Sequence, residues 1–227
     1  MSTIKKKAYK SRTRILIVDD HPMMRQGLAA LINNERDLIV CCEAETAQQA
    51  LATIAKERPD LVLADITLPD KSGLELIKDI HAQHPGLRVL VVSMHDEAIY
   101  AERVLRAGGR GYIMKQEGGK RLLEAIRQVL AGQVSVSEKM SARILEMFSS
   151  GRGTSGGSPV EKLTDREFEV FQLIGEGKAT RDIAAKLHLS VKTVEVHRLH
   201  IKEKLALKTA AELIRFAVRW TETQHTA

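Results

Sequence analysis

Residues 14–20 read RILIVDD, an arginine and four aliphatic residues followed by two aspartates, and this stretch decides the fold. A run of four apolar residues is too short for a membrane span and is typical of a strand that is buried on both faces. Similar runs recur at 38–43, 61–65, 88–93 and 111–114. Helical periodicity follows them at 23–33, 47–57, 73–83, 97–107 and 120–131. Because parallel strands require such crossover connections, we predict a doubly wound α/β domain with a five-stranded parallel sheet.

The composition changes abruptly at residues 149–159, SSGRGTSGGSP, which is too polar and glycine-rich to pack and is typical of a flexible tether. A helix predicted at 138–148 leads out of the α/β domain. Beyond the tether only helical patterns remain, at 165–175, 181–187, 191–205 and 210–220, so we predict a second, all-α domain. The predicted division is a basic tail at 1–13, the α/β domain at 14–135, a helix and linker at 136–160, and the helical domain at 161–222.

The overall composition excludes several classes of protein. With 44% hydrophobic and 28% charged residues the chain is neither disordered nor fibrous. The basic start imitates a signal peptide, but Asp19 and Asp20 interrupt the apolar run that follows, so we expect a cytoplasmic protein without a membrane partner. The two cysteines, Cys41 and Cys42, are adjacent and rarely form a relaxed disulfide, so we expect them to be packing residues.

Polar residues end or follow the predicted strands, at the edge where an open parallel sheet binds its ligands. Asp19 and Asp20 end the first strand and Asp65 the third, whereas Ser93 ends the fourth and Lys115 follows the fifth. Three carboxylates at one edge repel one another unless a cation is present, and Mg²⁺ prefers such oxygen ligands. A lysine and a hydroxyl beside that ion complete a site for the oxygens of a phosphoryl group.

The motifs ILIVDDHPMMRQGL, DLVLADITLPDKSGLEL, VLVVSM and GYIMK together resemble the receiver domain of two-component response regulators of the NarL/FixJ class. The resemblance covers about residues 14–132 and implies a flavodoxin-like fold. It implies that Asp65 accepts a phosphoryl group from a sensor histidine kinase. It also implies a Mg²⁺ site formed by Asp19, Asp20, Asp65 and the backbone carbonyl of Thr67.

The same resemblance assigns roles around the acceptor. Lys115 is expected to pair with the phosphoryl oxygens and Ser93 to donate its hydroxyl to them. Tyr112 matches the aromatic switch of the family, although a role in ordinary packing is an equal alternative. His21 is expected to be a surface residue near the kinase contact.

Thr67 bears on an alternative from the enzyme class, a Mg²⁺-dependent phosphatase or phosphotransferase. Such enzymes with an aspartyl nucleophile place a second aspartate two residues later as general acid and base, and threonine cannot replace it. The sequence therefore favours a phosphoacceptor with slow loss of the group to water over an enzyme. A third hypothesis is a DNA-binding or scaffolding protein whose acidic pocket is vestigial.

Most of the net charge of +6 lies in residues 1–14, which carry six Lys/Arg and no acid. A second cationic stretch runs from Lys192 to Lys208, with five Lys/Arg against two Glu. It falls on the predicted helix 191–205, which follows a shorter helix and a turn, as in a helix-turn-helix whose later helix enters the DNA major groove. Bulk charge alone proves little, but this local density favours contact with phosphates.

The region 161–220 resembles the LuxR-type (GerE) helix-turn-helix, through LTDREFEVFQLIGEGK and KTVEVH. The resemblance implies a four-helix domain that binds double-stranded DNA as a homodimer after phosphorylation. It implies dimer contacts from Leu213 and Phe216, for which packing in the small core is nearly as good an explanation. The residues that it implies at the DNA are Lys192, Thr193, Glu195, Val196, His197, Arg198 and Leu199, and Lys202 fits a phosphate contact or a solvated charge equally well.

Overall fold

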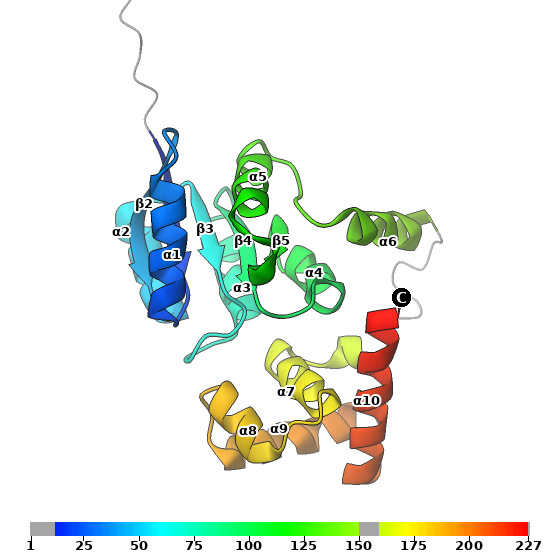
Figure 1. Cartoon of the computed structure of the whole chain (residues 1–227). Coiled ribbons are helices and arrows are strands. Elements are labelled where there is room, and N and C mark those ends of the chain that lie inside the picture. The colour runs from blue at the N-terminus through cyan, green and yellow to red at the C-terminus, as the bar shows by residue number, and fades with distance from the viewer. Residues whose placement is uncertain (1–11, 150–158, 227) are drawn as a thin grey trace, which may run out of the picture.

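The structure is a computed structural model that describes residues 12–149 and 159–226 (Figure 1). The predicted basic tail, except for its last two residues, and most of the predicted linker lie outside the described residues. The first described range forms the predicted five-stranded parallel sheet, in the order β2-β1-β3-β4-β5. The strands are β1 (Thr13–Val18), β2 (Leu38–Ala44), β3 (Leu61–Ala64), β4 (Arg88–Ser93) and β5 (Gly111–Met114).

Helices cover both faces of this sheet, as the alternation of strands and helices predicts. Ile15 and Ile17 of β1 are buried in one apolar cluster with residues of the first and fifth helices. Leu16 and Val18 are buried on the opposite face, in a cluster with residues of the second, third and fourth helices. The helices are α1 (Pro22–Asn33), α2 (Ala47–Glu57), α3 (Gly73–Gln83), α4 (Glu97–Arg106), α5 (Gly119–Leu130) and α6 (Glu138–Ser149), with a 3-10 turn at Lys115–Glu117.

β1 and β3 end one residue earlier than predicted. The amide of Asp19 still bonds to the carbonyl of Ala44, and that of Asp65 to the carbonyl of Val18. The backbone of each aspartate is therefore still hydrogen-bonded to the neighbouring strand, and its side chain lies just beyond the end of its own strand. Since β1 and β3 are paired neighbours, the two side chains emerge at the same edge.

The second described range is helical, as predicted. α7 begins with a capping box, in which the Thr164 hydroxyl accepts a hydrogen bond from the Glu167 amide and the Glu167 carboxylate accepts one from the Thr164 amide. The last helix continues six residues beyond its predicted end. The elements are a 3-10 turn at Pro159–Lys162, α7 (Asp165–Gly175), α8 (Thr180–Lys186), α9 (Val191–Lys204) and α10 (Ala210–Thr226).

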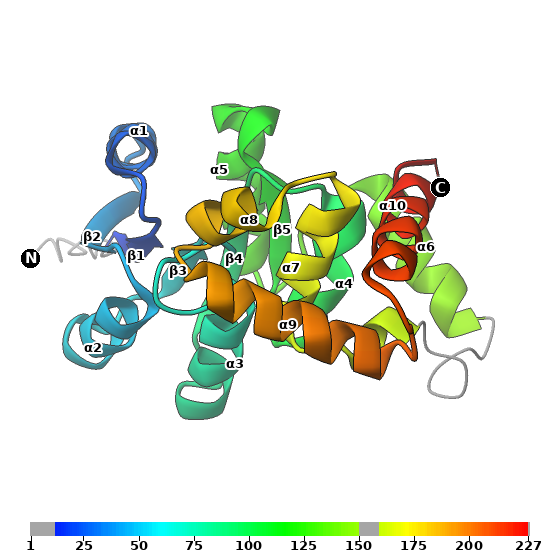
Figure 2. The same cartoon turned by 90° about the horizontal axis from the view of Figure 1, so that it is seen from below.

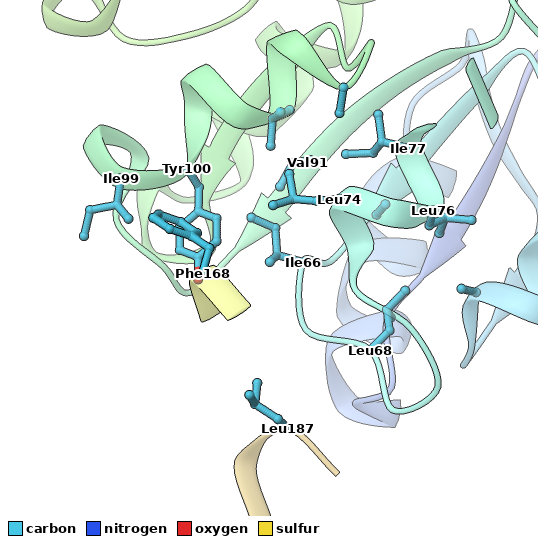
Figure 3. Packing of buried hydrophobic residues seen from close by; sticks show 14 of the residues in the cluster. Ile66, Leu68, Leu74, Leu76, Ile77, Val91, Ile99, Tyr100, Phe168 and Leu187 are labelled. Carbon is cyan, nitrogen blue, oxygen red and sulfur yellow. The ribbon is translucent and has the colours of Figure 1, made fainter. Parts of the chain in front are cut away.

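The helical domain lies against the carboxyl edge of the sheet, with α7 toward the sheet and α9 on the outer side (Figures 1 and 2). Phe168 of α7 packs edge-on against Tyr100 of α4 with ring centroids 5.3 Å apart, as Figure 3 shows. Arg103 of α4 lies over the Phe168 ring and donates to the carbonyl of Val160. No described helix is long and apolar enough to cross a membrane.

Candidate functional site

A cluster of acidic side chains lies where β1 and β3 end. Asp19 and Asp65 are only 2% and 5% exposed. One potential ligand atom from each of Asp19, Asp20, His21 and Asp65 lies within 4.8 Å of the others. The structure thus brings together the three carboxylates that the sequence analysis placed at one edge.

His21 belongs to this cluster and was predicted only as a surface residue. Its Nδ1 lies 2.7 Å from Oδ1 of Asp20 and 3.2 Å from Oδ1 of Asp19. The sequence feature that places His21 in the cluster is its position directly after the two aspartates, at the start of α1. Its imidazole is nevertheless largely exposed, which agrees with the predicted surface position.

Lys115 provides the cation of the cluster. Its Nζ lies 2.7 Å from Oδ2 of Asp19 and 2.6 Å from Oδ2 of Asp65, and its side chain is 3% exposed. Burial lowers the pKa of Lys115, but the carboxylates of Asp65 and Asp19 outweigh it and the pKa is raised. For Asp65, burial and the charge of Asp19 outweigh the effect of Lys115, and its pKa is also raised.

One lysine faces three carboxylates here, so the cluster keeps excess negative charge when all three are ionised. Oδ1 of Asp20 is moreover buried and accepts no hydrogen bond from the described residues, although His21 lies close to it. A divalent cation that takes oxygen ligands fits such a donor set. Asp19, Asp20 and Asp65 are the carboxylates available to hold it, with His21 beside them, and the expected ligation by the backbone carbonyl of Thr67 stays a prediction.

The Asp65 carboxylate is held by its own loop. Oδ1 of Asp65 accepts hydrogen bonds from the amides of Ile66 at 2.6 Å and Thr67 at 3.4 Å, while Oδ2 faces Lys115. Gly73 closes this loop, and its amide donates to the carbonyl of Ile66. A Cβ at Gly73 would lie 2.2 Å from the carbonyl oxygen of Asp65, so only glycine fits there.

Ser93, Tyr112 and Thr67 meet at a residue that the sequence analysis missed, His95. The His95 amide donates to the Ser93 hydroxyl, and the Tyr112 hydroxyl donates to the His95 carbonyl at 2.8 Å. Nε2 of His95 lies 3.1 Å from Oγ1 of Thr67. Burial, then Lys186 and Lys115, lowers the pKa of His95 to about 4, so the imidazole is neutral at pH 7. Tyr112 is 1% exposed and already points inward, a position compatible with both of its expected roles.

The outer face of α9 carries part of the predicted DNA-contacting set. Lys192, Glu195, Val196 and Leu199 are exposed, whereas Thr193, Arg198 and Lys202 are half-buried. Val196 and Leu199 expose 43% and 49% of their surface although both are apolar. An exposed apolar pair beside polar residues suits contact with base edges and thymine methyl groups.

His197 lies only partly on that outer face, because it is half-buried. It is three residues after Val194 and four before Ile201, both of which are fully buried. Its Nδ1 is buried without a hydrogen-bond partner among the described residues, and burial lowers its pKa. The helical period thus turns the Nδ1 edge of the imidazole inward, and the DNA contact expected of His197 stays a prediction.

Leu213 on α10 is a core residue, so its prediction as a dimer contact does not fit this arrangement. It is 0% exposed, and a side chain without accessible surface cannot contact a second chain. Phe216 is half-buried and packs on Phe171, with ring centroids 5.9 Å apart. The exposed apolar residue of this helix is Ile214, with 43% of its surface accessible.

Two family models match the chain. One, described as the response regulator receiver domain, matches residues 15–127, and the other, described as bacterial regulatory proteins of the luxR family, matches residues 161–217. The oxygen regulatory protein NreC of Staphylococcus epidermidis is 34% identical over 211 residues, which cover 91% of this chain and 97% of that protein.

Solved structures are also similar. A LuxR-family two-component response regulator from Aurantimonas sp. is 33% identical with a TM-score of 0.57, over 61% of this chain and 99% of that one. RcsB from Salmonella enterica serovar Typhimurium, bound to promoter P1flhDC in the presence of the phosphomimetic BeF3−, is 26% identical with a TM-score of 0.59. That match covers 91% of this chain and 98% of RcsB.

Proposed function

This chain belongs to the response regulators that join a receiver domain to a LuxR-type DNA-binding domain, and from that premise we propose that phosphorylation of Asp65 controls its action on DNA. The chain is a DNA-binding response regulator and not a classical enzyme. The observation that carries the proposal is the buried Asp65 carboxylate, held 2.6 Å from Lys115 inside the acidic cluster.

The proposed chemistry is transfer of a phosphoryl group from a histidine of a sensor kinase. An oxygen of Asp65 forms a bond to phosphorus as the bond from phosphorus to the imidazole nitrogen breaks, and the electron pair of that bond stays with the imidazole. Mg²⁺, when bound, offsets the charge of the transferring oxygens. Lys115 is placed to pair with the same oxygens, and the amides of Ile66 and Thr67 orient the carboxylate.

Storage of the group, with slow loss to water, follows from what surrounds the acceptor. The side chain two residues after Asp65 is Thr67, and its hydroxyl is engaged by His95. Thr67 therefore offers no carboxylate to activate water. The rival hypothesis of a phosphatase lacks its second acid/base group at this position.

Control through pairing of two chains is the proposed output. The receiver leaves the outer face of α9 exposed, so covering of this helix is not what restrains the unmodified chain in this arrangement. A single small helical domain makes few base contacts, and two copies on two half-sites supply the affinity that a specific operator needs. The structure of RcsB on a promoter in the presence of a phosphomimetic supports a link between a modified receiver and DNA binding.

The test has two parts. Intact-mass analysis after incubation with acetyl phosphate and Mg²⁺ should show one phosphoryl adduct, which Asp65→Asn abolishes and the control Asp60→Asn retains. Selection of operators from random DNA, with and without the phosphate donor, should return a two-fold symmetric site that is enriched by phosphorylation. An adduct that persists in Asp65→Asn would refute the acceptor, and failure to select any DNA would refute the output.

A further inference from the structure

The turn between α8 and α9 reaches into the acidic cluster of the other domain. Nε2 of His188 lies 3.3 Å from Oδ2 of Asp20, whose side chain is 14% exposed. Oδ1 of Asp20 faces His21 at 2.7 Å. Both oxygens of this carboxylate therefore face imidazole groups, one of which comes from the DNA-binding domain.

The backbone at His188 is unusual for this residue type. Its φ of 53° lies in the left-handed region that follows many helices and that favours glycine. The amide bonds to the carbonyl of Ala185 as the helix ends. The turn itself therefore favours a residue without a side chain, whereas the position holds an imidazole that meets the receiver.

Other contacts orient the helical domain on this edge of the sheet. The carboxylate of Asp165 lies 2.7 Å from Nζ of Lys78 and 3.4 Å from a guanidinium nitrogen of Arg103. The buried Ser72 hydroxyl donates to the carboxylate of Glu169. These bonds join α7 to α3 and α4, and they hold the α8–α9 turn where His188 meets Asp20.

We propose that the docked DNA-binding domain competes with Mg²⁺ for the acidic cluster, through His188 on Asp20. The inference rests on the proposed function, because it takes this cluster as the magnesium site. The carboxylate oxygen that faces His188, Oδ2, is not free to ligate a metal, so the docked domain leaves the ion only Oδ1 of Asp20, beside His21. Because coupling between two binding equilibria is reciprocal, any factor by which docking weakens Mg²⁺ binding is the factor by which Mg²⁺ weakens docking.

The consequence is that the receiver binds Mg²⁺ more weakly, and is phosphorylated more slowly, while the DNA-binding domain is docked. His188 links the occupancy of the acceptor pocket to the position of α7, α8 and α10. The domain is then released before the chemical step, by the ion that the step requires, and the phosphoryl group retains the open form.

The test uses the full chain with Mg²⁺ alone, at constant pH. His188→Gly removes the imidazole and suits the left-handed backbone, so the variant should fold, which circular dichroism checks. Ala206→Gly is the matched control, because Ala206 has a φ of 55° at the end of α9 and an exposed side chain. Calorimetric titration should show Mg²⁺ binding about threefold tighter in His188→Gly and unchanged in Ala206→Gly, as expected for a partly exposed pair.

A second variant keeps the proposal testable if His188 has effects within its own turn. Asp165→Asn removes the partner of Lys78 and Arg103 and should undock the domain, so Mg²⁺ affinity should rise without any change at His188. His188→Gly should then raise Mg²⁺ affinity by a smaller factor in the Asp165→Asn background than in the native chain. Small-angle scattering should show a larger radius of gyration on addition of Mg²⁺ to the native chain.

Two results would overturn the proposal, and they are distinguishable. Equal Mg²⁺ affinity in the native chain, His188→Gly and Asp165→Asn would show that docking and metal binding are independent, and would leave the proposed function intact. Absence of Mg²⁺ binding in the native chain and both variants would refute the metal site itself, and with it the proposed mechanism of phosphoryl transfer.

Discussion

Replacement of Lys115 by methionine tests whether the acidic cluster depends on its single buried cation. Methionine keeps much of the shape of the side chain but leaves Asp19 and Asp65 facing each other without a counter-charge. The three side chains are 3%, 3% and 5% exposed, so solvent screens them little. Loss of one member of a buried ion pair lowers the free energy of unfolding by about 3–5 kcal/mol, and we expect a loss in this range.

The pH dependence of this loss has a definite sign. The pKa of Asp65 is already raised in the folded chain and rises further when Lys115 is removed. An acid with a raised folded-state pKa destabilises the fold only when it is ionised. The free energies of unfolding of Lys115→Met and the native chain should therefore be most similar at acid pH. The deficit should grow as the pH rises through the folded-state pKa of Asp65.

The assay is urea denaturation followed by circular dichroism, with and without Mg²⁺. Trp220, the one tryptophan of the chain, lies in the helical domain and gives an internal fluorescence reference for that domain. Mg²⁺ at one hundred times the dissociation constant of the native chain stabilises that chain by about 2.7 kcal/mol. At the same concentration the gain should be larger in the variant, because Lys115 no longer repels the ion. Lys56→Met is the control, since that side chain is 83% exposed. A loss below about 1 kcal/mol in Lys115→Met would refute this account of the cluster.

Three further changes test other parts of the structure. Asp65→Asn should abolish phosphoryl adducts without lowering the free energy of unfolding, because it removes a buried charge whose pKa burial raises; a clear loss in urea titration would contradict this. Gly73→Ala should destabilise the chain by about 1–3 kcal/mol, because the new Cβ meets the Asp65 carbonyl. The control Gly27→Ala in α1 should stabilise it by about 0.5–1 kcal/mol, because a Cβ there meets no atom within 4 Å. His197→Gln should reduce the acid sensitivity of the helical domain, since a histidine with a lowered folded pKa costs stability as pH falls below about 6.5; parallel pH profiles of Trp220 unfolding would exclude that role.

The sheet and its acidic edge were predictable because both follow from local pattern and a topological rule. Continuous aliphatic runs identify strands that are buried on both faces, and parallel crossovers place every strand end at one edge. Asp19, Asp65 and Lys115 therefore converge without knowledge of any side-chain distance. The raised pKa of Asp65 follows from burial, which the same pattern implies.

His95 and Leu213 show where prediction from the sequence fails. His95 bonds to its near neighbour Ser93 and to two residues that are distant in sequence, Thr67 and Tyr112, and a histidine after a strand does not by itself indicate such contacts. Leu213 sits in a helix whose period was recognised, but the face of a helix in a small domain depends on which neighbours cover it. The contact of His188 with Asp20 depends on how two domains dock, and no local pattern specifies that geometry.

The uncovered outer face of α9 bears on how the unmodified protein finds its target. Lys192 is accessible there in the docked form, so the chain retains a weak, salt-dependent attraction to any duplex. Such attraction permits sliding and hopping along the chromosome before a signal arrives. The kinase would then change how long a pair of chains stays at an operator, while the rate at which single chains reach it stays the same.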